Sequence, residues 1–243
     1  EYRRQRQMCI RDRRIKSTTD RLRQANHRLE QLSLTDELTG LNNMRSFDRK
    51  FEELMNACAS GVTSAAVVMM DLDHFKSVND QTNHLVGSYV ISEVGSLVRT
   101  SRIFRERDIL ARFGGDEFIF AVAGTDFDSA KIQIEAVRQL LASHTFSCDG
   151  FTLNLTVSLG LAWVEKGFRG KSQDVVKAAD LMLYRSKHLG RNRLSSMILS
   201  YPVNLDMELA RRLARRGSMM VESAASTHDG SDFPLKVKFA GNG

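Results

Sequence analysis

Acidic residues stand at the ends of two strand-like segments of this chain. Asp71 and Asp73 end an apolar, β-branched segment, and Asp116 and Glu117 follow a pair of glycines. If these two strands pair, several carboxylates meet at one edge of a sheet. Such oxygen ligands suit hard cations: Mg²⁺ is held by one or two carboxylates together with substrate phosphates. Carboxylates at strand ends are also often merely solvated, so this pattern alone leaves both interpretations open.

The elements that would position these carboxylates follow from hydrophobic periodicity and turn residues. We expect helices over Met44–Cys58, Val86–Arg99, Ser129–Ser143 and Asp174–His188, strands over Val62–Leu72, Phe151–Val157 and on to Val164, and a hairpin with arms Ile109–Phe113 and Glu117–Val122. The order βαββα, followed by further strands and a helix, predicts an α+β fold of the α/β-sandwich type. Its core would be ferredoxin-like or polymerase-palm-like, with antiparallel strands and helices on one face. Phe118 is expected in that core.

Four segments are expected along the chain. Residues 1–13 resemble the translation of a sequencing-library adapter and are expected not to be native. Residues 14–33 hold apolar residues at heptad spacing from Ile15 to Leu32, which predicts a coiled-coil-type signalling or dimerisation helix, or else a helix packed on its own domain. Residues 34–194 form the main domain, and residues 195–243 a C-terminal extension that is partly disordered.

Composition excludes several classes of protein. The 243 residues suffice for one core, and no apolar run is long enough to cross a bilayer. The three cysteines are far apart, which argues against a disulfide framework or a zinc site and favours the cytoplasm. Residues 1–13 carry half of the net charge of +6, and the chain has no recognised nucleic-acid-binding motif. Nucleic acid is therefore not expected as a partner. The chain lacks an initiator Met, and we expect missing upstream sequence, with a sensory domain or membrane tether.

A set of motifs in a fixed order narrows the interpretation further than the carboxylates alone. In order they are Asp36-Glu-Leu-Thr-Gly-Leu41, Asp71-Leu-Asp-His-Phe-Lys-Ser-Val-Asn-Asp80, Arg112-Phe-Gly-Gly-Asp-Glu-Phe118, Ser158-Leu-Gly160, Ala179-Asp-Leu-Met-Leu-Tyr184 and Lys187-His-Leu-Gly-Arg-Asn192. This set resembles the GGDEF-domain diguanylate cyclases over about Leu34 to Arg193. The resemblance implies a nucleotidyltransferase that condenses two GTP into cyclic di-GMP and two pyrophosphates.

The resemblance also assigns the metal site. Asp71, the carbonyl of Leu72 and Asp116 match the metal ligands of the family, and Glu117 matches the second acidic residue of the signature. Asp116, Glu117 and Asp71 are therefore the expected catalytic residues. Two Mg²⁺ or Mn²⁺ ions would polarise the α-phosphate and stabilise the departing pyrophosphate.

Nucleotide-binding residues follow by the same resemblance. Lys76, Lys187 and Arg191 match positions that hold the triphosphate, with help from backbone N–H groups between Asp73 and Lys76, and Asn79 matches a base contact. The remaining expected members of the nucleotide site are Phe75, His84, Ser88, Gly114 and Gly115. The two glycines have a structural interpretation as a tight turn and a functional one, because no side chain blocks the nucleotide there.

Two further expectations concern regulation. Arg105 and Asp108 stand at the RxxD spacing before the signature, where relatives bind the cyclic dinucleotide product, which implies product inhibition. One triphosphate per domain cannot form a ring from two nucleotides, so the family requires a homodimer in which two domains face each other. The Ile15–Leu32 helix would set how often they meet.

One departure from the family concerns the base. The family reads Gly-His-x-x-Gly-Asp where this chain has Asn83 to Ser88. Asn83 in place of glycine is expected to accept left-handed turn geometry. Ser88 in place of Asp replaces an acceptor-only carboxylate with a hydroxyl that donates or accepts, so guanine and adenine are less well distinguished. The same change marks the hybrid branch that makes cyclic GMP-AMP, so ATP becomes a possible second substrate. A guanine-selective enzyme that relies on Asn79 remains the alternative.

Two other functions stay open at this point. A catalytically inactive domain would act as a cyclic-dinucleotide receptor through Arg105 and Asp108. The presence of Asp71, Asp116 and Glu117 argues against it. A basic amphipathic stretch, Met207–Met220, is compatible with a helix on a membrane surface.

Overall fold

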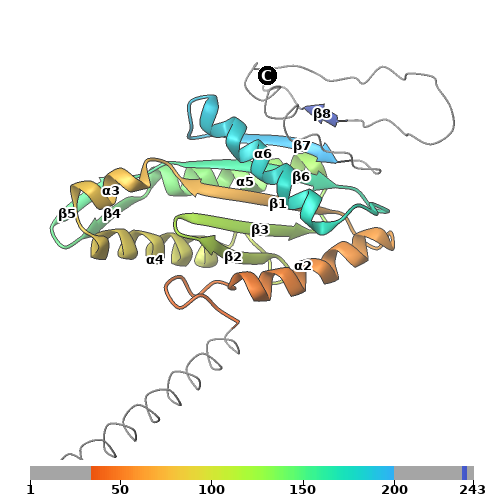
Figure 1. The fold of residues 1–243 in the computed structure, drawn as a ribbon, viewed down its shortest axis with the longest axis horizontal. Helices are drawn as coiled ribbons and strands as arrows, with labels where there is room; N and C mark the ends of the chain where they lie inside the picture. The colour runs from red at the N-terminus through yellow and green to blue at the C-terminus, as the bar shows by residue number, and fades with distance from the viewer. Residues whose placement is uncertain (1–33, 200–236, 240–243) are drawn as a thin grey trace, which may run out of the picture. The chain divides into compact units, whose positions relative to one another are not determined.

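The computed structural model describes residues 34–199 and 237–239. The elements in chain order are α2 (Met44–Ala59), β1 (Ala65–Leu72), α3 (Phe75–Gln81), α4 (His84–Thr100), β2 (Ile109–Gly114), β3 (Glu117–Ala123), α5 (Phe127–Ser143), β4 (Thr145–Cys148), β5 (Phe151–Asn154), β6 (Val157–Val164), α6 (Ser172–His188), β7 (Leu194–Leu199) and β8 (Val237–Phe239) (Figure 1). The predictions for residues 1–13, for the helix in residues 14–33 and for Met207–Met220 lie outside the described residues.

The main sheet has the strand order β2-β3-β1-β6-β7-β8. Strand β1 lies between β3 and β6 and is antiparallel to both, whereas β7 runs parallel to β6 (Figure 1). The four strands β1, β2, β3 and β6, with α4 and α5 as their connections, form a ferredoxin-like βαββαβ unit. The expected α+β core is therefore confirmed.

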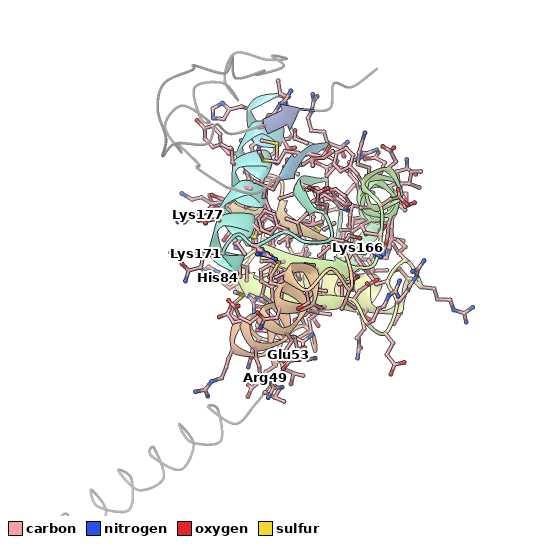
Figure 2. All side chains as sticks on the ribbon, turned by 90° about the vertical axis from the view of Figure 1, so that its right-hand side faces the viewer. Arg49, Glu53, His84, Lys166, Lys171 and Lys177 are labelled. Atoms are coloured by element: carbon pink, nitrogen blue, oxygen red, sulfur yellow. The ribbon has the colours of Figure 1, made fainter. Side chains whose placement is uncertain are left out.

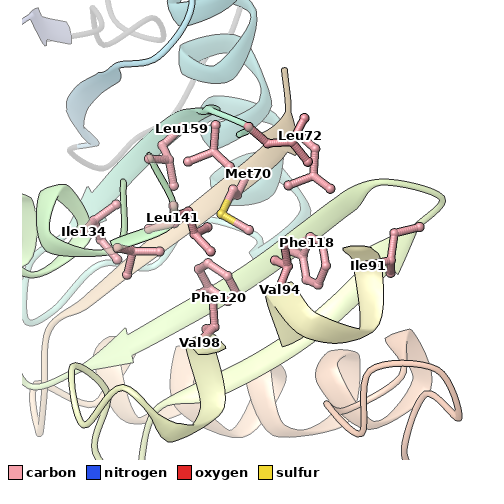
Figure 3. Packing of buried hydrophobic residues seen from close by; sticks show 14 of the residues in the cluster. Met70, Leu72, Ile91, Val94, Val98, Phe118, Phe120, Ile134, Leu141 and Leu159 are labelled. Carbon is pink, nitrogen blue, oxygen red and sulfur yellow. The ribbon is translucent and has the colours of Figure 1, made fainter. Parts of the chain in front are cut away.

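Helices cover both faces of this sheet, and the prediction of helices on one face was wrong. Alternate residues of β1 enter two different cores, Ala66, Val68 and Met70 with α4 and α5, and Ala65, Val67 and Met69 with α2 and α6. Figure 3 shows the first core, where Met70 and Phe120 face residues of the neighbouring helices. All eight residues of β1 are buried. Such a continuous apolar strand needs cover on each side.

One predicted strand is divided in the structure, and strand β7 lies where no strand was predicted. The expected strand Phe151–Val157 is divided: β5 ends at Asn154 and pairs with β4 in a separate hairpin, and β6 begins at Val157 in the main sheet. Between them, the carbonyl of Thr156 accepts the N–H of Asp73, which separates the two pairings. Strand β7 extends to Leu199, so the main sheet continues past residue 194, where the domain was expected to end.

Side-chain caps fix where the helices begin. Asn43 accepts the N–H of Ser46 at the start of α2, and Asp126 accepts the N–H of Ser129 at the start of α5. Asn83 caps α4 by accepting from Leu85 and Val86. Its φ is −156°, so the expected left-handed geometry was wrong and the residue acts as an N-cap instead. Charged side chains such as Arg49, Glu53 and Lys177 project outward from the helices (Figure 2).

Close backbone contact fixes α6 on the sheet. A Cβ atom at Gly160 of β6 would overlap the backbone of α6 at Ala179 and Leu183. Glycine at this position therefore lets the helix lie directly on the strand, which sets the place of the residues at the end of α6. In the part of the chain that the structure describes, no helix has the length and apolar character needed to cross a membrane.

Candidate active site

Three expected metal-site carboxylates come together at one end of the central strands. Asp71 at the end of β1 lies opposite Glu117 of β3 and Ser158 of β6. Asp116 precedes Glu117 in the turn, and its carbonyl accepts the N–H of Leu72 at 3.4 Å. The expected meeting of acidic residues at one sheet edge is thus found, because antiparallel pairing aligns the end of β1 with the start of β3.

Burial and neighbouring charges raise the pKa values of two of these carboxylates, Asp71 and Glu117. Burial raises the pKa of Asp71, and the charges of Asp116 and Asp73 raise it further, against the opposing effect of Lys187. Burial likewise raises the pKa of Glu117, with Asp71, Asp116 and Asp180 adding to the shift. Clustered negative charge of this kind is unfavourable without a cation.

Lys187 supplies the cation in this structure. Its Nζ lies 2.7 Å from Oδ2 of Asp71, at the C-terminal end of α6. The expected phosphate-binding lysine is therefore engaged with an expected metal ligand.

The donor set fits a divalent ion that is completed by substrate. Across residues 34–199 and 237–239, no three His, Cys, Asp or Glu side chains are grouped so that they would hold a metal by themselves. Asp71, Asp116 and the carbonyl of Leu72 offer few oxygen ligands, which matches Mg²⁺, since this ion keeps waters and takes substrate phosphates as ligands. The number of ions stays a prediction.

Asp73 has a role that the sequence did not reveal. It is 3% exposed, and its carboxylate accepts hydrogen bonds from Ser158 Oγ at 2.6 Å, Thr156 Oγ1 at 2.7 Å and the N–H of Asn192 at 3.0 Å. The N–H of Asp73 donates to Thr156, so it is not available to a phosphate as expected. Asp73 ties together the ends of β1 and β6 and the loop after α6.

A pocket of about 400 Å³ opens beside the carboxylates. Seven of the expected site residues line it: Phe75, Lys76, Asn79, His84, Ser88, Gly115 and Asp116. Gly87 and Ile91 complete its wall. The side chains of Lys76, His84 and Ser88 are exposed in it. Figure 2 labels His84 at the start of α4. Gly114, Lys187 and Arg191 do not line this pocket, and Lys187 lies instead at Asp71.

Gly87 sets the position of Asn79. A Cβ atom at Gly87 would overlap Oδ1 of Asn79 and lie 3.3 Å from the ring of Phe75. Only glycine therefore leaves Asn79 its present place on the pocket wall. The family pattern includes this glycine, but the reason for it appears only when α3 and α4 pack together.

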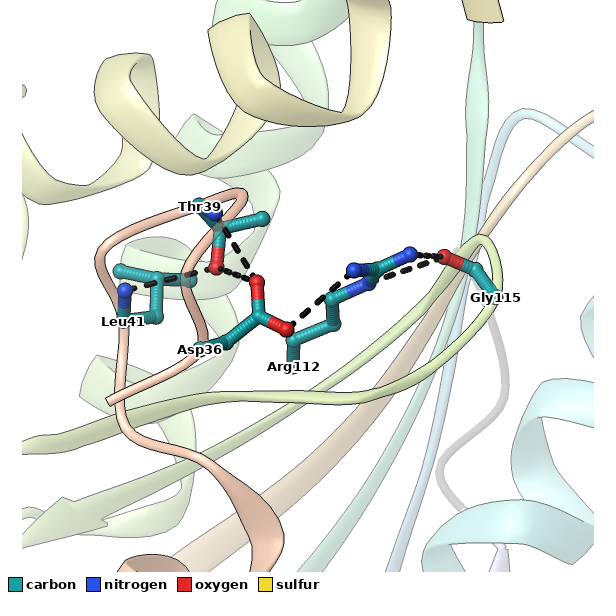
Figure 4. A network of polar contacts seen from close by, with 5 residues as sticks. All are labelled: Asp36, Thr39, Leu41, Arg112 and Gly115. Carbon is teal, nitrogen blue, oxygen red and sulfur yellow. Dashed lines mark hydrogen bonds and ion pairs between the residues drawn. The ribbon is translucent and has the colours of Figure 1, made fainter. Parts of the chain in front are cut away.

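The glycine turn is held from outside the site. Arg112 donates from Nε and Nη2 to the carbonyl of Gly115, at 3.1 and 2.8 Å, and from Nη1 to Asp36 at 3.2 Å (Figure 4). Asp36 also accepts from the N–H and Oγ1 of Thr39. Burial alone would raise the pKa of Asp36, but the hydrogen bonds from Thr39 and the charge of Arg112 lower it overall. The Asp36–Leu41 motif thus braces the turn before Asp116.

The loop after α6 carries Arg191 at its exposed surface. Arg191 has φ of 61° and Asn192 has φ of 44°, both in the left-handed region. The N–H of Arg191 donates to the carbonyl of Ser186 at 3.0 Å. This loop stands near the carboxylates through the bond between Asn192 and Asp73.

The RxxD residues form a turn before β2. Arg105 is exposed, and its backbone N–H donates to the carboxylate of Asp108 at 2.9 Å. Asp108 also accepts the N–H of Ala123 at 3.1 Å and lies 3.4 Å from Nε2 of Gln133. The carboxylate is fixed by these donors, and the Arg105 side chain remains at the surface.

Comparison with known proteins shows which family the sequence resembles. Residues 33–193 match the family model described as "Diguanylate cyclase, GGDEF domain". Diguanylate cyclase DgcP of Pseudomonas aeruginosa is 33% identical over 164 residues, 68% of this chain and 24% of that protein. Diguanylate cyclase A of Treponema denticola is 30% identical over 173 residues, 70% of this chain and 46% of that protein.

Not every similar protein is named a cyclase. Cyclic di-GMP phosphodiesterase NbdA of Pseudomonas aeruginosa is 30% identical over 211 residues, 85% of this chain and 26% of that protein. The chain therefore spans between about a quarter and a half of the length of these three relatives.

The fold agrees with a solved structure. The GGDEF domain of DgcB from Caulobacter crescentus, determined in complex with c-di-GMP, has 30% sequence identity and a TM-score of 0.63, and the match covers 68% of this chain and 95% of that one. With the family model matching most of the chain, the assignment is direct. This chain belongs to the diguanylate cyclase GGDEF-domain family.

Proposed function

We propose that the protein joins two purine nucleoside triphosphates into a cyclic dinucleotide. With GTP, each 3′-hydroxyl attacks the α-phosphorus of the other nucleotide, two O3′–P bonds form, and two pyrophosphates and the hydroxyl protons leave. The observation that carries this proposal is the placement of Asp71, Asp116 and Glu117 beside a pocket lined by Lys76 and Asn79.

Each residue of the site has a proposed role in binding the metal, the triphosphate or the reacting hydroxyl. Asp71, Asp116 and the Leu72 carbonyl would hold the metal, and Mg²⁺ or Mn²⁺ would supply positive charge to the α-phosphate and the leaving pyrophosphate when bound. Lys76, Lys187 and Arg191 bind the triphosphate. Lys187 first has to exchange Asp71 for a phosphate oxygen, since its ammonium is at 2.7 Å from that carboxylate. Glu117 accepts the proton of the 3′-hydroxyl, which its raised pKa favours.

The ring needs two domains. One pocket binds one triphosphate, whose 3′-hydroxyl has to attack the α-phosphate of a second nucleotide. A homodimer that brings two pockets face to face supplies that second nucleotide. The specific activity is expected to rise with protein concentration until dimers predominate. A constant specific activity from dilute monomer would contradict this part of the proposal.

Ser88 relaxes the choice of purine. Its exposed hydroxyl lies on the wall of the pocket, and a hydroxyl donates to adenine N1 as readily as it accepts from guanine. We therefore extend the proposal to GTP plus ATP, with cyclic GMP-AMP as a product beside cyclic di-GMP.

One assay tests activity and product together. The protein is incubated with GTP, with ATP and with an equimolar mixture in the presence of Mg²⁺, and the products are separated by chromatography and identified by mass. Cyclic dinucleotides are expected from the wild type and none from Asp116→Ala, with circular dichroism to show that the variant is folded. Cyclic di-GMP as the sole product of the mixture would refute relaxed selectivity, and no dinucleotide under any condition would refute the cyclase itself.

Product binding is proposed at Arg105 and Asp108. The exposed Arg105 beside the fixed carboxylate of Asp108 presents a guanidinium fork and an acceptor together. Titrating cyclic di-GMP is expected to lower the initial rate of the wild type and to leave that of Arg105→Ala unchanged. A domain that binds cyclic di-GMP but forms none from GTP would instead support the receptor function.

A further inference from the structure

The loop between α6 and β7, residues 189–193, adopts a conformation that needs outside support. Arg191 and Asn192 are consecutive non-glycine residues with positive φ, 61° and 44°. A side chain in the left-handed region is unfavourable, and such geometry persists where the surroundings impose it. Since Arg191 is the proposed triphosphate ligand on this loop, whatever imposes the geometry also sets the direction in which its side chain leaves the backbone.

Two contacts on Asn192 impose it. The backbone N–H of Asn192 donates to Oδ2 of the buried Asp73 at 3.0 Å. Its side-chain Oδ1 accepts Nη1 of Arg138 at 2.7 Å. The loop residue next to Arg191 is therefore held by its backbone on one side and by its side chain on the other.

Arg138 is itself a fixed anchor. Its Nη2 lies 2.6 Å from Oε1 of Glu135 and its Nε donates to the same oxygen at 2.8 Å, and its side chain is 19% exposed. Arg138 belongs to α5, which packs in the core with α4, whereas the loop follows α6, which packs on the opposite face of the sheet. The bond between Arg138 and Asn192 thus joins helices from the two faces at the end of the strands.

This contact contributes little to the core. α5 is already held by Ala130, Ile134, Val137 and Leu141, which are fully or almost fully buried. Arg138 and Asn192 instead both line an open pocket of about 600 Å³. Loss of the bond between them would free the loop without unpacking α5.

We propose that Arg138 and Asn192 are positioning residues that hold Arg191 ready to bind the triphosphate. The inference rests on the proposed function, because it assigns to Arg191 the phosphate contact proposed above. Helix α5 adds no residue to the pocket beside Asp116. Under this proposal it nevertheless supports the nucleotide site through Arg138.

The test compares Arg138→Met and Asn192→Gly, singly and together, in the wild-type and in the Arg191→Ala backgrounds. Glycine at 192 keeps the backbone N–H to Asp73 and accepts positive φ without strain. Lys131→Met is the matched control, because Lys131 lines the same pocket from α5, carries the same charge and contacts Phe127 rather than the loop. The readouts are calorimetric binding of a GTP analogue with a methylene group between the α and β phosphates, in Mg²⁺, and KM and kcat for GTP.

Arg138→Met and Asn192→Gly are each expected to weaken analogue binding and raise KM for GTP roughly tenfold, as for loss of one hydrogen bond from a charged donor. The double variant should be no worse than either single one. Neither change should have a further effect once Arg191 is alanine, and Lys131→Met should bind as the wild type does. If the loss of binding depends on the presence of Arg191, the two residues act by positioning it and not through a general effect on the structure.

Three results would overturn the proposal. They are unchanged binding in both single variants, an equal loss of binding in the Arg191→Ala background, or a wild type that does not bind the analogue. If Arg138→Met does not fold in thermal denaturation, Arg138→Lys and Asn192→Gly give the same comparison. A wild type that binds the analogue but forms no dinucleotide would contradict the proposed function, while the binding measurements would still decide this inference.

Discussion

Lys187 and Asp71 form an ion pair of 2.7 Å between the end of α6 and the end of β1. The pair offsets part of the repulsion at this end of the sheet, where burial and the charge of Asp116 raise the pKa values of Asp71 and Glu117. Both partners have proposed roles with substrate, one on phosphate and the other on metal. The ion pair therefore supplies positive charge inside the acidic cluster, but it offsets only part of the effect that burial and neighbouring carboxylates have on the negative charge of Glu117.

Removing that charge is expected to stabilise the protein. The pKa of Glu117 is raised above its ordinary value of 4.5, so the folded state binds the proton more readily, and ionisation of Glu117 destabilises the fold as pH rises through that range. Glu117→Gln should therefore unfold at a higher urea concentration than the wild type at pH 7 without metal. The difference should shrink as pH falls from the raised pKa of the folded state toward 4.5, and it should be lost below about 4.5, where the wild-type side chain is protonated in both states. The variant should make no dinucleotide, and a pH-independent difference in unfolding would argue against the interpretation.

The brace on the glycine turn is expected to serve catalysis more than stability. Arg112→Met should lower kcat, because it frees the carbonyl of Gly115 next to Asp116. The Arg112 and Asp36 side chains are 18% and 22% exposed, so their coupling in unfolding should be modest, about 0.5–1 kcal/mol. A double-mutant cycle of Arg112→Met with Asp36→Asn, followed by urea unfolding and initial rates, measures both. A wild-type kcat in Arg112→Met would contradict this role.

Gly87→Ala is expected to separate stability from nucleotide binding. Alanine favours the helix by about 1 kcal/mol over glycine, but its Cβ overlaps the place of Asn79 Oδ1. We expect little change in the melting temperature and a rise in KM for GTP of roughly 2- to 10-fold, as for one lost hydrogen bond. In an Asn79→Ala background the same substitution should leave KM unchanged. An equal rise there would show that Gly87 acts by another route.

Gly160→Ala is expected to be severely destabilising. The new methyl group would meet backbone atoms of α6 at Ala179 and Leu183, which cannot rotate away as a side chain can. The free energy of unfolding should fall by about 3 kcal/mol or more. Gly114→Ala is the control, since its Cβ has no neighbour within 4 Å, and it should unfold as the wild type does. Similar urea midpoints for the two variants would contradict the close contact between β6 and α6.

Ser88→Asp is expected to restrict the enzyme to guanine. A carboxylate accepts from guanine N1–H and N2–H₂ but meets the acceptor N1 of adenine, so preference for GTP over ATP in kcat/KM should rise at least about tenfold. Product analysis from the equimolar mixture should show cyclic GMP-AMP diminished relative to cyclic di-GMP. Ser88→Ala, which removes the hydroxyl without adding charge, should not produce this shift. An unchanged product ratio in Ser88→Asp would assign purine choice to another residue.

The sequence by itself determined the local features. The apolar run before Asp71, the paired glycines before Asp116 and the periodicity of the helices predicted the ferredoxin-like core and the meeting of the carboxylates. These predictions succeeded because hydrophobic period and turn residues act over a few neighbouring positions. The run of β1 also held a signal that was missed, since a strand with no polar alternation must be covered on both faces.

Only the tertiary structure decided which distant residues meet. Arg112 reaches Asp36 across 76 residues, and Asn192 reaches Asp73 across 119. Asp73 is a buried acceptor for three donors, from Thr156, Ser158 and Asn192, and none of these partners is near it in the sequence. Which side chain fills which space depends on strand register and on helices packing against both faces. The partner of each such side chain is therefore decided when distant segments assemble, and its neighbours in the sequence do not specify it.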